Sequence, residues 1–328
     1  MNEFSHFIKT IGRGKRTGRY LSQDEAYRAF SLLLEGSAEP EQVGAFLMLL
    51  RVREEAPEEL AGFVQACRNH SEPSLAGLQP DLDLGCYAGK RRHLPWFLLA
   101  VLCLAQSGRQ IFLHGAAEPD SQRLYLAPVF AALDLPIAQS TAEAKTHLQN
   151  YGLTYCGLEV CNPKLFQLLQ MRTLFGLRSP ASTLARMLNP SQARFSFHGV
   201  FHKHFDQRHV ETARLIGDNQ VSCLRGEGGE VEVNPERPLD QYILRDGKIH
   251  TQSFPALLAK PQIKPRQLDI QQLARVWRGQ SDSEYAEQAV IGTLASMLSL
   301  MDYLTPNAAL AQAQTLWRHR AIAAVKVA

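Results

Sequence analysis

Three consecutive cations, Lys90, Arg91 and Arg92, are the residues of this sequence best placed to bind an anion. They follow a short apolar segment at 82–84 and a turn at 85–89 that begins and ends with glycine. A glycine-bearing turn between a strand and a helix presents backbone N–H groups to an anion, and these side chains add positive charge. The pattern predicts a phosphate site. The alternative is a solvated helix N-terminus, although cations there oppose the helix dipole.

Positive charge is concentrated in residues 161–214, which contain eight Lys or Arg but only two acids, Asp206 and Glu211. The cations that we expect to continue the phosphate site are Arg172, Arg178, Lys203 and Arg208. Arg13 and Lys15 lie in a basic, glycine-rich loop near the N-terminus, which either extends the positive surface or is simply solvated. This charge distribution predicts an acidic partner.

The sequence predicts no metal site. Its six cysteines are scattered, without a C-x-x-C or paired Cys/His spacing, and are expected to be reduced. His202 and His204 are two residues apart, so on a helix they would point in different directions, and no carboxylate is suitably spaced to join them.

The bulk composition is that of a globular protein, with 328 residues, 45% hydrophobic content and a formal net charge of +3. The N-terminus lacks the cationic start and apolar core of a signal peptide. The longest apolar run, residues 94–105, is too short to span a bilayer. We therefore expect a cytoplasmic location.

Helices are predicted throughout residues 22–69, where apolar residues recur at helical spacing. Ser22 followed by Glu25 forms a capping box, Gly36 ends the first helix and Pro57 begins a later one. These breaks exclude a coiled coil and indicate a compact helical layer.

From about residue 80, short apolar runs alternate with helical ones, which favours a mostly parallel sheet covered by helices. The predicted strands are 82–84, 110–114, 156–160, 221–224 and 230–233. The predicted helices are 96–106, 124–133, 164–175, 181–188 and 202–216. The fold class is therefore α/β, with a small helical domain packed on a larger α/β domain.

Several segments resemble the anthranilate phosphoribosyltransferase superfamily of glycosyltransferase family 3. The segments similar to its helical-domain signature are 22–26, Gly36, 41–48 and 54–62, and 171–178 resembles its second signature. The resemblance implies a helical domain from residues 1–75 plus about 162–188, an α/β domain from 76–161 plus 189–328, and a cleft between them. It also implies a homodimer formed through the helical domain.

The ligand loops of this superfamily are degenerate here. Its Gly-Thr-Gly-Gly-Asp turn is replaced by a segment from Gly85 to Gly89 with the bulky Tyr87 inside it. Its Lys-His-Gly-Asn-Arg motif survives only as His114 and Gly115. Of its metal-binding Asp-Glu pair, Glu232 alone remains, preceded by Val231, which makes a poor magnesium site. A transferase must stabilise its pyrophosphate leaving group, so these changes argue against that activity.

These departures and the added cations resemble the YbiB-type branch, whose members have the transferase fold and bind nucleic acid. Shared features include residues 11–15, 226–231 and 233–235. The resulting hypothesis is a non-catalytic homodimer that binds nucleic acid, preferably a single strand, with Tyr87 or His202 stacking on a base. No cofactor is expected.

Two alternatives remain open. The chain could be an active phosphoribosyltransferase that acts on an aromatic acid or base and uses Mg²⁺, supported by Arg172 at the position that holds an aromatic carboxylate. Arg172 could instead contact phosphate or form a structural ion pair. The other alternative is a scaffold that binds only proteins.

Overall fold

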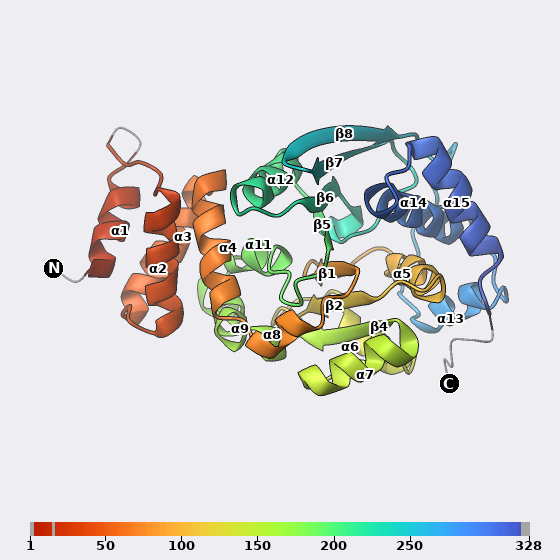
Figure 1. Ribbon diagram of the computed structural model, residues 1–328, viewed down its shortest axis with the longest axis horizontal. Coiled ribbons are helices and arrows are strands. Elements are labelled where there is room, and N and C mark those ends of the chain that lie inside the picture. Colours follow the sequence, from red (N-terminus) through yellow and green to blue (C-terminus); the bar gives the residue numbers. More distant parts are fainter. Residues whose placement is uncertain (1–2, 15–16, 323–328) are drawn as a thin grey trace.

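The computed structural model describes residues 3–14 and 17–322, arranged as a helical domain beside an α/β domain (Figure 1). The N-terminal helices are α1 (Glu3–Gly12), α2 (Gln23–Glu35), α3 (Pro40–Arg53) and α4 (Pro57–Asn69). Four later helices are α8 (Leu158–Cys161), α9 (Pro163–Gln170), α10 (Arg172–Phe175) and α11 (Ala181–Arg186). Leu165 and Leu184 of the later group share one buried cluster with Phe30 and Phe63 of the first, so two distant parts of the chain form one core.

The predicted ends of α2 are confirmed in atomic detail. Ser22 Oγ accepts the Glu25 backbone N–H at 3.2 Å, and the Glu25 carboxylate accepts the Ser22 N–H at 2.9 Å. Gly36 ends the helix with φ of 78°, a left-handed conformation that suits glycine. These local interactions explain why sequence alone placed this helix well.

The α/β domain is built on one sheet of eight strands within the described residues. The strands are β1 (Leu82–Cys86), β2 (Ile111–Gly115), β3 (Ile137–Ala138), β4 (Leu153–Gly157), β5 (Phe195–Val200), β6 (Gln220–Arg225), β7 (Leu239–Arg245) and β8 (Lys248–Phe254). Their spatial order is β3-β4-β2-β1-β5-β6-β7-β8. The first six are parallel, and β7 and β8 are antiparallel. The predicted fold class is therefore confirmed.

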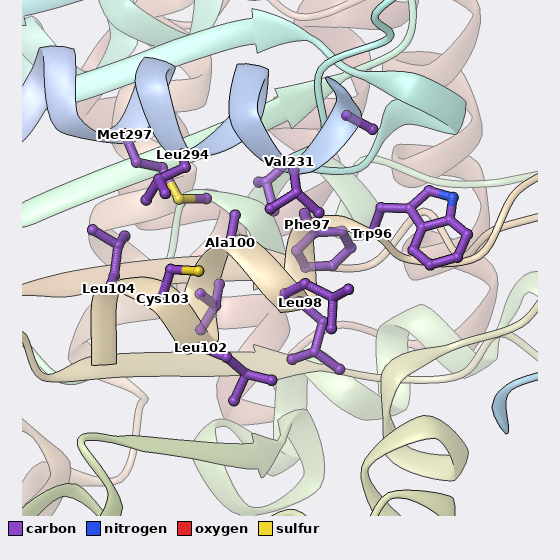
Figure 2. Close-up of a cluster of buried hydrophobic side chains, with 14 of the residues drawn as sticks. Trp96, Phe97, Leu98, Ala100, Leu102, Cys103, Leu104, Val231, Leu294 and Met297 are labelled. Carbon is purple, nitrogen blue, oxygen red and sulfur yellow. The ribbon is translucent and has the colours of Figure 1, made fainter. Parts of the chain in front are cut away.

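Helices cover the sheet and supply the larger core. They are α5 (Phe97–Gln106), α6 (Leu126–Ala132), α7 (Thr141–Tyr151), α12 (Phe205–Leu215), α13 (Gln271–Trp277), α14 (Glu284–Met301) and α15 (Pro306–Arg318). Figure 2 shows Leu294 and Met297 of α14 packed over Ala100 and Leu104 of α5. Because α5 is apolar on nearly every face, it must be buried between the sheet and α14.

Four predicted elements differ from the structure. The helix expected at 164–175 is divided at Met171 into α9 and α10. The strand expected at 156–160 is β4, Leu153–Gly157, because the polar Thr154 is buried within it and α8 begins at Leu158. Residues 230–233 are not a strand, since they follow two left-handed glycines and Val233 N–H bonds the Thr293 side chain. The helix expected from 202 begins at Phe205, because His204 has φ of 71°.

Candidate anion-binding cleft

The turn at 85–89 lies at the carboxyl end of β1, where ligands of open parallel sheets bind. Its anion-binding backbone is already occupied by an acidic side chain of the same protein. The Gly89 N–H donates to Glu230 Oε1 at 2.5 Å, and the side chain of Glu230 is buried. Burial raises the pKa of this carboxyl, and its second oxygen has no hydrogen-bond partner. An internal carboxylate therefore occupies the position where an anionic ligand was expected.

Lys90 is also engaged internally, so the expectation that it contacts phosphate is wrong. Its Nζ lies 2.6 Å from Glu232 Oε1, and both side chains are buried. The other oxygen of Glu232 accepts the Phe97 N–H at 2.9 Å, at the N-terminus of α5. Burial raises the pKa of Glu232. Glu232 therefore ties both Lys90 and the start of α5 to the segment that follows β6.

The residues at the expected metal position do not fit Mg²⁺. Both carboxylate oxygens of Glu232 are used by Lys90 and Phe97, and the preceding Val231 is apolar and fully buried. Magnesium requires oxygen ligands in octahedral geometry, which this pair does not offer.

Tyr87 and His114 form a buried polar chain beneath the turn. The Tyr87 hydroxyl lies 2.7 Å from His114 Nδ1, and His114 Nε2 lies 3.1 Å from Asp83 Oδ1. Tyr87 is fully buried, and burial raises the pKa of its hydroxyl well above the ordinary value. The prediction that Tyr87 stacks on a base is therefore wrong. The hydrogen bonds from Tyr87 through His114 to Asp83 instead fix the ends of β1 and β2 relative to each other.

Gly85 and Gly115, which belong to the two degenerate ligand loops, are needed for packing. A Cβ on Gly85 would lie 2.8 Å from Arg186 Cα, and one on Gly115 would lie 2.4 Å from the Cys86 carbonyl oxygen. Their retention reflects close backbone approach within the fold.

Arg172 and Arg178 converge on one buried carboxylate, Glu118. Arg178 Nη2 donates to Glu118 Oε2 at 2.8 Å, and Arg172 Nη1 donates to the same oxygen. Glu118 is 4% exposed and lies in the loop after β2, more than fifty residues away in sequence. The structural ion pair that sequence analysis left open for Arg172 is thus present. These two arginines bridge the helical domain to the sheet.

Arg91 and Arg92 are exposed, and no carboxylate among the described residues lies within ion-pairing distance of either. Burial lowers the pKa of the nearby Arg123 guanidinium, and the positive charges of Arg178 and Arg91 lower it further. Neither Arg91 nor Arg92 lines the nearby cavity. The two side chains provide a positive surface beside the cleft.

A cavity of about 270 Å³ opens between the two domains. Its cationic lining residues are Arg51 of α3, Arg123, Arg178 and Arg186 of α11, joined by His202 and His209. No carboxylate side chain of the described residues is part of this lining. Such a cavity favours an anion.

Backbone pairing positions Arg123 at the cavity. Lys90 and Leu124 exchange two backbone hydrogen bonds of 2.8 Å. This pairing holds Arg123, the residue before Leu124, against the turn at 85–89. Arg123 Nη1 then donates to the carbonyl oxygens of Ala88 and Gly89, each at 3.2 Å. These contacts satisfy part of the guanidinium without neutralising its charge.

Arg186 lies deepest. It is 9% exposed, its Nη1 donates to the Ser182 carbonyl oxygen at 2.5 Å, and its Nε has no hydrogen-bond partner. Burial lowers its pKa, and Glu230 and Glu118 oppose that effect through space without forming an ion pair. The buried charge is therefore only partly compensated.

The remaining predicted cations, Lys203, Arg208, Arg13 and Lys15, differ in their surroundings. Lys203 is exposed near the cavity and has no carboxylate within ion-pairing distance among the described residues. Arg208 instead pairs with Glu54 at 3.1 Å and lies over the Phe205 ring. Arg13 is exposed and directly follows α1, the helix that lies farthest from the sheet in the helical domain (Figure 1). Lys15 lies outside the described residues.

An exposed aromatic side chain stands at the cavity mouth. Phe201 is 66% exposed and follows β5, beside exposed His202. The buried His209 behind them has a pKa well below the ordinary value, because burial disfavours its charged form. Phe201 and His202 are thus accessible rings at the cavity mouth, and the prediction that His202 stacks on a base stays a prediction.

Sequence reasoning missed the roles of Glu118, Glu230, Arg51 and Arg123. Glu230 lies in the glycine-rich segment 226–231, which was noted only for its resemblance. Nothing in the sequence around Arg51 or Arg123 marks them, since they meet only when distant loops and helices pack together.

The structure is a helical domain packed on an α/β domain, with the cavity between them. Residues 6–71 match the family described as "Glycosyl transferase family, helical bundle domain". The chain is 29% identical over 233 residues to anthranilate phosphoribosyltransferase of Methylocella silvestris, a match that covers 71% of this chain and 66% of that protein. It is 27% identical over 250 residues to the uncharacterized protein YbiB of Escherichia coli K12, covering 75% and 78% of the two chains.

The crystal structure of anthranilate phosphoribosyltransferase from Thermus thermophilus has the same fold. It aligns with a TM-score of 0.77 at 19% identity, covering 97% of this chain and 94% of that one. Together these matches support placing the protein in the anthranilate phosphoribosyltransferase-like superfamily, with YbiB among its relatives. No helix among the described residues is both long and apolar enough to cross a bilayer.

Proposed function

We propose that this protein binds the sugar-phosphate backbone of nucleic acid at the interdomain cleft and does not catalyse phosphoribosyl transfer. The observation that carries the proposal is the distribution of charge around the cleft. Arg51, Arg123 and Arg186 line a cavity without an ion-pair partner among the described residues, and Arg91 and Arg92 lie exposed nearby. Uncompensated cations are suited to capture a polyanion.

Internal carboxylates support the non-catalytic part of the proposal. Glu230 accepts the N–H group that a pyrophosphate would need, and Glu118 occupies Arg172, the residue that resemblance assigned to an aromatic carboxylate. A substrate would have to displace both buried groups. That displacement would leave buried charges unpaired, at a cost of several kcal/mol.

Contacts to phosphate carry little sequence information, so the proposed binding is largely independent of sequence. A single strand is the favoured form, because a cleft accommodates a flexible chain and Phe201 offers an exposed ring for stacking. Phe201 replaces the buried Tyr87 in the stacking role that sequence analysis assigned to Tyr87 or His202, and His202 remains available for it.

The proposal includes a homodimer formed through the helical domain, in the cytoplasm. A largely apolar hollow of about 480 Å³ on that domain is lined by Ile11, Leu49 and Val52, with Arg19 and Arg53 also in its lining, and Val52 is 85% exposed. All six cysteines are buried and unpaired, as expected of a reducing compartment.

The test is a titration of a fluorescent single-stranded 30-mer at several salt concentrations. The affinity should fall as salt rises, with a slope of about 0.7 in log units for each phosphate contact. Replacing both exposed cations, R91A/R92A, should weaken binding and flatten the slope. An unchanged affinity and slope would refute the assignment of this surface.

A matched double variant, K248A/R318A, serves as the control. Both residues are exposed cations. Lys248 lies at the β7–β8 turn, beside the start of β6, and so at the opposite end of the strands from the cleft. The control should bind as the native protein does.

Calorimetry with phosphoribosyl pyrophosphate and Mg²⁺ tests the transferase alternative. The occupied turn predicts no magnesium-dependent binding. Tight binding that requires the metal would contradict the non-catalytic proposal and favour the enzyme.

A further inference from the structure

The enclosed part of the cleft has features beyond those needed for a passing strand. Arg186 is nine-tenths buried, and its Nε faces no hydrogen-bond partner. A buried guanidinium without a full set of acceptors is costly. The Nε atom is itself shielded from solvent, so an arriving anion would offset that cost through its charge and through contacts with the part of the side chain that lines the cavity. The side chain lines the cavity, so a ligand inside could reach it.

The groups around Arg186 match a phosphate monoester. Arg123 and Arg51 line the same cavity, as do Ser179, Ser182 and Thr183, whose side chains carry hydroxyl groups. Arginine binds phosphate oxygens through parallel N–H bonds, and hydroxyls donate to the remaining oxygens. A monoester has up to two negative charges where an internal phosphodiester has one, so it gains more from several arginines.

The nearby carboxylates do not compete for this position. Glu118 is held by Arg172 and Arg178, and Glu230 by the Gly89 N–H. Neither side chain lines the cavity. The positive charge therefore remains available to a ligand that enters from solvent.

The cavity size selects an end of a strand. A volume of about 270 Å³ lies near the lower limit of small-molecule pockets, and is sufficient for a phosphate with part of one nucleoside. An internal phosphodiester would have to bring both flanking nucleotides down to Arg186, whereas a terminal phosphate extends from one nucleotide only. Phe201, exposed at the mouth, is placed to stack on that nucleotide's base.

We infer that this cavity binds a nucleoside phosphate monoester, carried at the end of a nucleic-acid strand. Arg186 and Arg123 hold the phosphate, Arg51 adds charge from the helical domain, and Phe201 stacks on the terminal base. The inference rests on the proposed function, because it gives the same cleft a preference for strand ends over internal positions.

The experiment compares single-stranded 12-mers of one sequence with a 5′-phosphate, a 3′-phosphate or neither, in fluorescence competition against the full-length protein. At least one phosphorylated strand should bind about tenfold more tightly than the unphosphorylated strand, as expected for charge-assisted hydrogen bonds. R123Q should reduce that advantage to less than about threefold, whereas R318A should retain it. F201A should weaken binding of the phosphorylated strand.

R186M provides a second cavity variant, and circular dichroism checks that it folds. If R186M folds and binds phosphorylated and unphosphorylated 12-mers equally, the result would support Arg186 as a phosphate contact. If R186M does not fold, the R123Q result alone tests the cavity. Equal binding of all three 12-mers would overturn the inference and leave the proposed function intact. Failure to bind any strand would overturn the proposed function.

A separate titration with adenosine 5′-monophosphate and inorganic phosphate distinguishes a strand end from a free nucleotide. Weaker binding of the mononucleotide than of the phosphorylated 12-mer supports the strand end. Mononucleotide binding that equals or exceeds that of the 12-mer would overturn it.

Discussion

At the residue scale, three buried glutamates occupy hydrogen-bond donors and cations beside this cleft, so those groups are not available to an anionic ligand. Glu230 accepts the Gly89 N–H, Glu232 pairs with Lys90, and Glu118 pairs with Arg178. Each of these donors could otherwise bind a ligand. Each glutamate comes from a segment distant from its partner, so folding brings anion and donor together. The chain thereby supplies internal acceptors to donors of the cleft that a ligand would otherwise meet.

The first prediction concerns Glu230. Glu230→Ala removes the carboxylate that accepts the Gly89 N–H and should destabilise the protein by about 1–3 kcal/mol, because a buried donor loses its partner. Urea unfolding measures the change. Inorganic phosphate at about 20 mM should restore part of the stability, because the N–H group becomes free to bind an anion.

Glu230→Gln is the matched control, since its amide oxygen can still accept from Gly89. It should show no stabilisation by phosphate beyond that of the native protein. If E230A responds to phosphate no more than this control does, the turn is not an anion site hidden by Glu230.

The second prediction concerns Glu55, which is 6% exposed at the start of the α3–α4 connection. Burial raises its pKa from 4.5 to about 7. The folded state therefore holds the proton more tightly, so this contribution to stability is complete below about pH 4.5 and is lost as pH rises through 7.

Glu55→Gln stays neutral at every pH and should remove that loss. A rise from 4.5 to about 7 corresponds to about 3 kcal/mol at most, so the variant should exceed the native protein by up to that amount at about pH 8.5. The two should be nearly equal at about pH 4. Urea unfolding at both pH values provides the measurement, and a gap of the same size at both would contradict the assignment.

Among the elements, α2 and α4 make the tightest approach in the helical domain. A Cβ on Gly62 of α4 would lie 2.2 Å from the Gln23 carbonyl oxygen and 2.6 Å from the Tyr27 backbone nitrogen. These are backbone atoms, so they cannot rotate aside. The glycine therefore sets the distance between the two helices.

The third prediction is that Gly62→Ala lowers stability by at least about 3 kcal/mol, because α4 must move away from α2. Thermal unfolding measures the loss. Gly77→Ala is the control, since a Cβ there has nothing within 4 Å and its φ is not in the left-handed region. Similar melting temperatures for the two variants would contradict the packing argument.

Elements with local signals were predictable from sequence, and those without were not. The capping box at Ser22 and the glycine at 36 define α2 through neighbours in sequence. The segment 230–233 reads as a strand by composition, but a hydrogen bond to Thr293 and the preceding left-handed glycines hold it in an irregular path. The antiparallel hairpin of β7 and β8 also escaped sequence reasoning, because its exposed strand β8 is largely polar.

At the scale of the whole molecule, unpaired cations lie on both sides of one cleft. Arg51 comes from the helical domain and Arg123 from the α/β domain, while Arg172 and Arg178 tie the domains together through Glu118. Because the bridge is an ion pair, it fixes the relative position of the two walls. A rigid cleft reduces the ordering cost when a ligand binds.

The fourth prediction concerns assembly. The protein should sediment at twice the chain mass of 36.6 kDa, and Val52→Asp should shift it toward the monomer by placing charge in the apolar hollow. Ile263→Asp is the control, because Ile263 is fully exposed in the α/β domain. Analytical ultracentrifugation measures both. A native monomer would contradict the homodimer, and equal effects of the two variants would exclude this hollow as the interface.

The sequence by itself determined the fold class, the helical layer and the loss of the transferase ligand motifs, because capping, periodicity and motif residues are local properties. It also identified Arg91 and Arg92, together with Lys90, as cations suited to bind an anion. Only the tertiary structure decided that Lys90, Arg172 and Arg178 are neutralised and that Arg51, Arg123 and Arg186 line the cavity. The physical reason is that a charge is free or paired according to neighbours in space, and Glu118 and Glu232 approach their partners from more than fifty residues away.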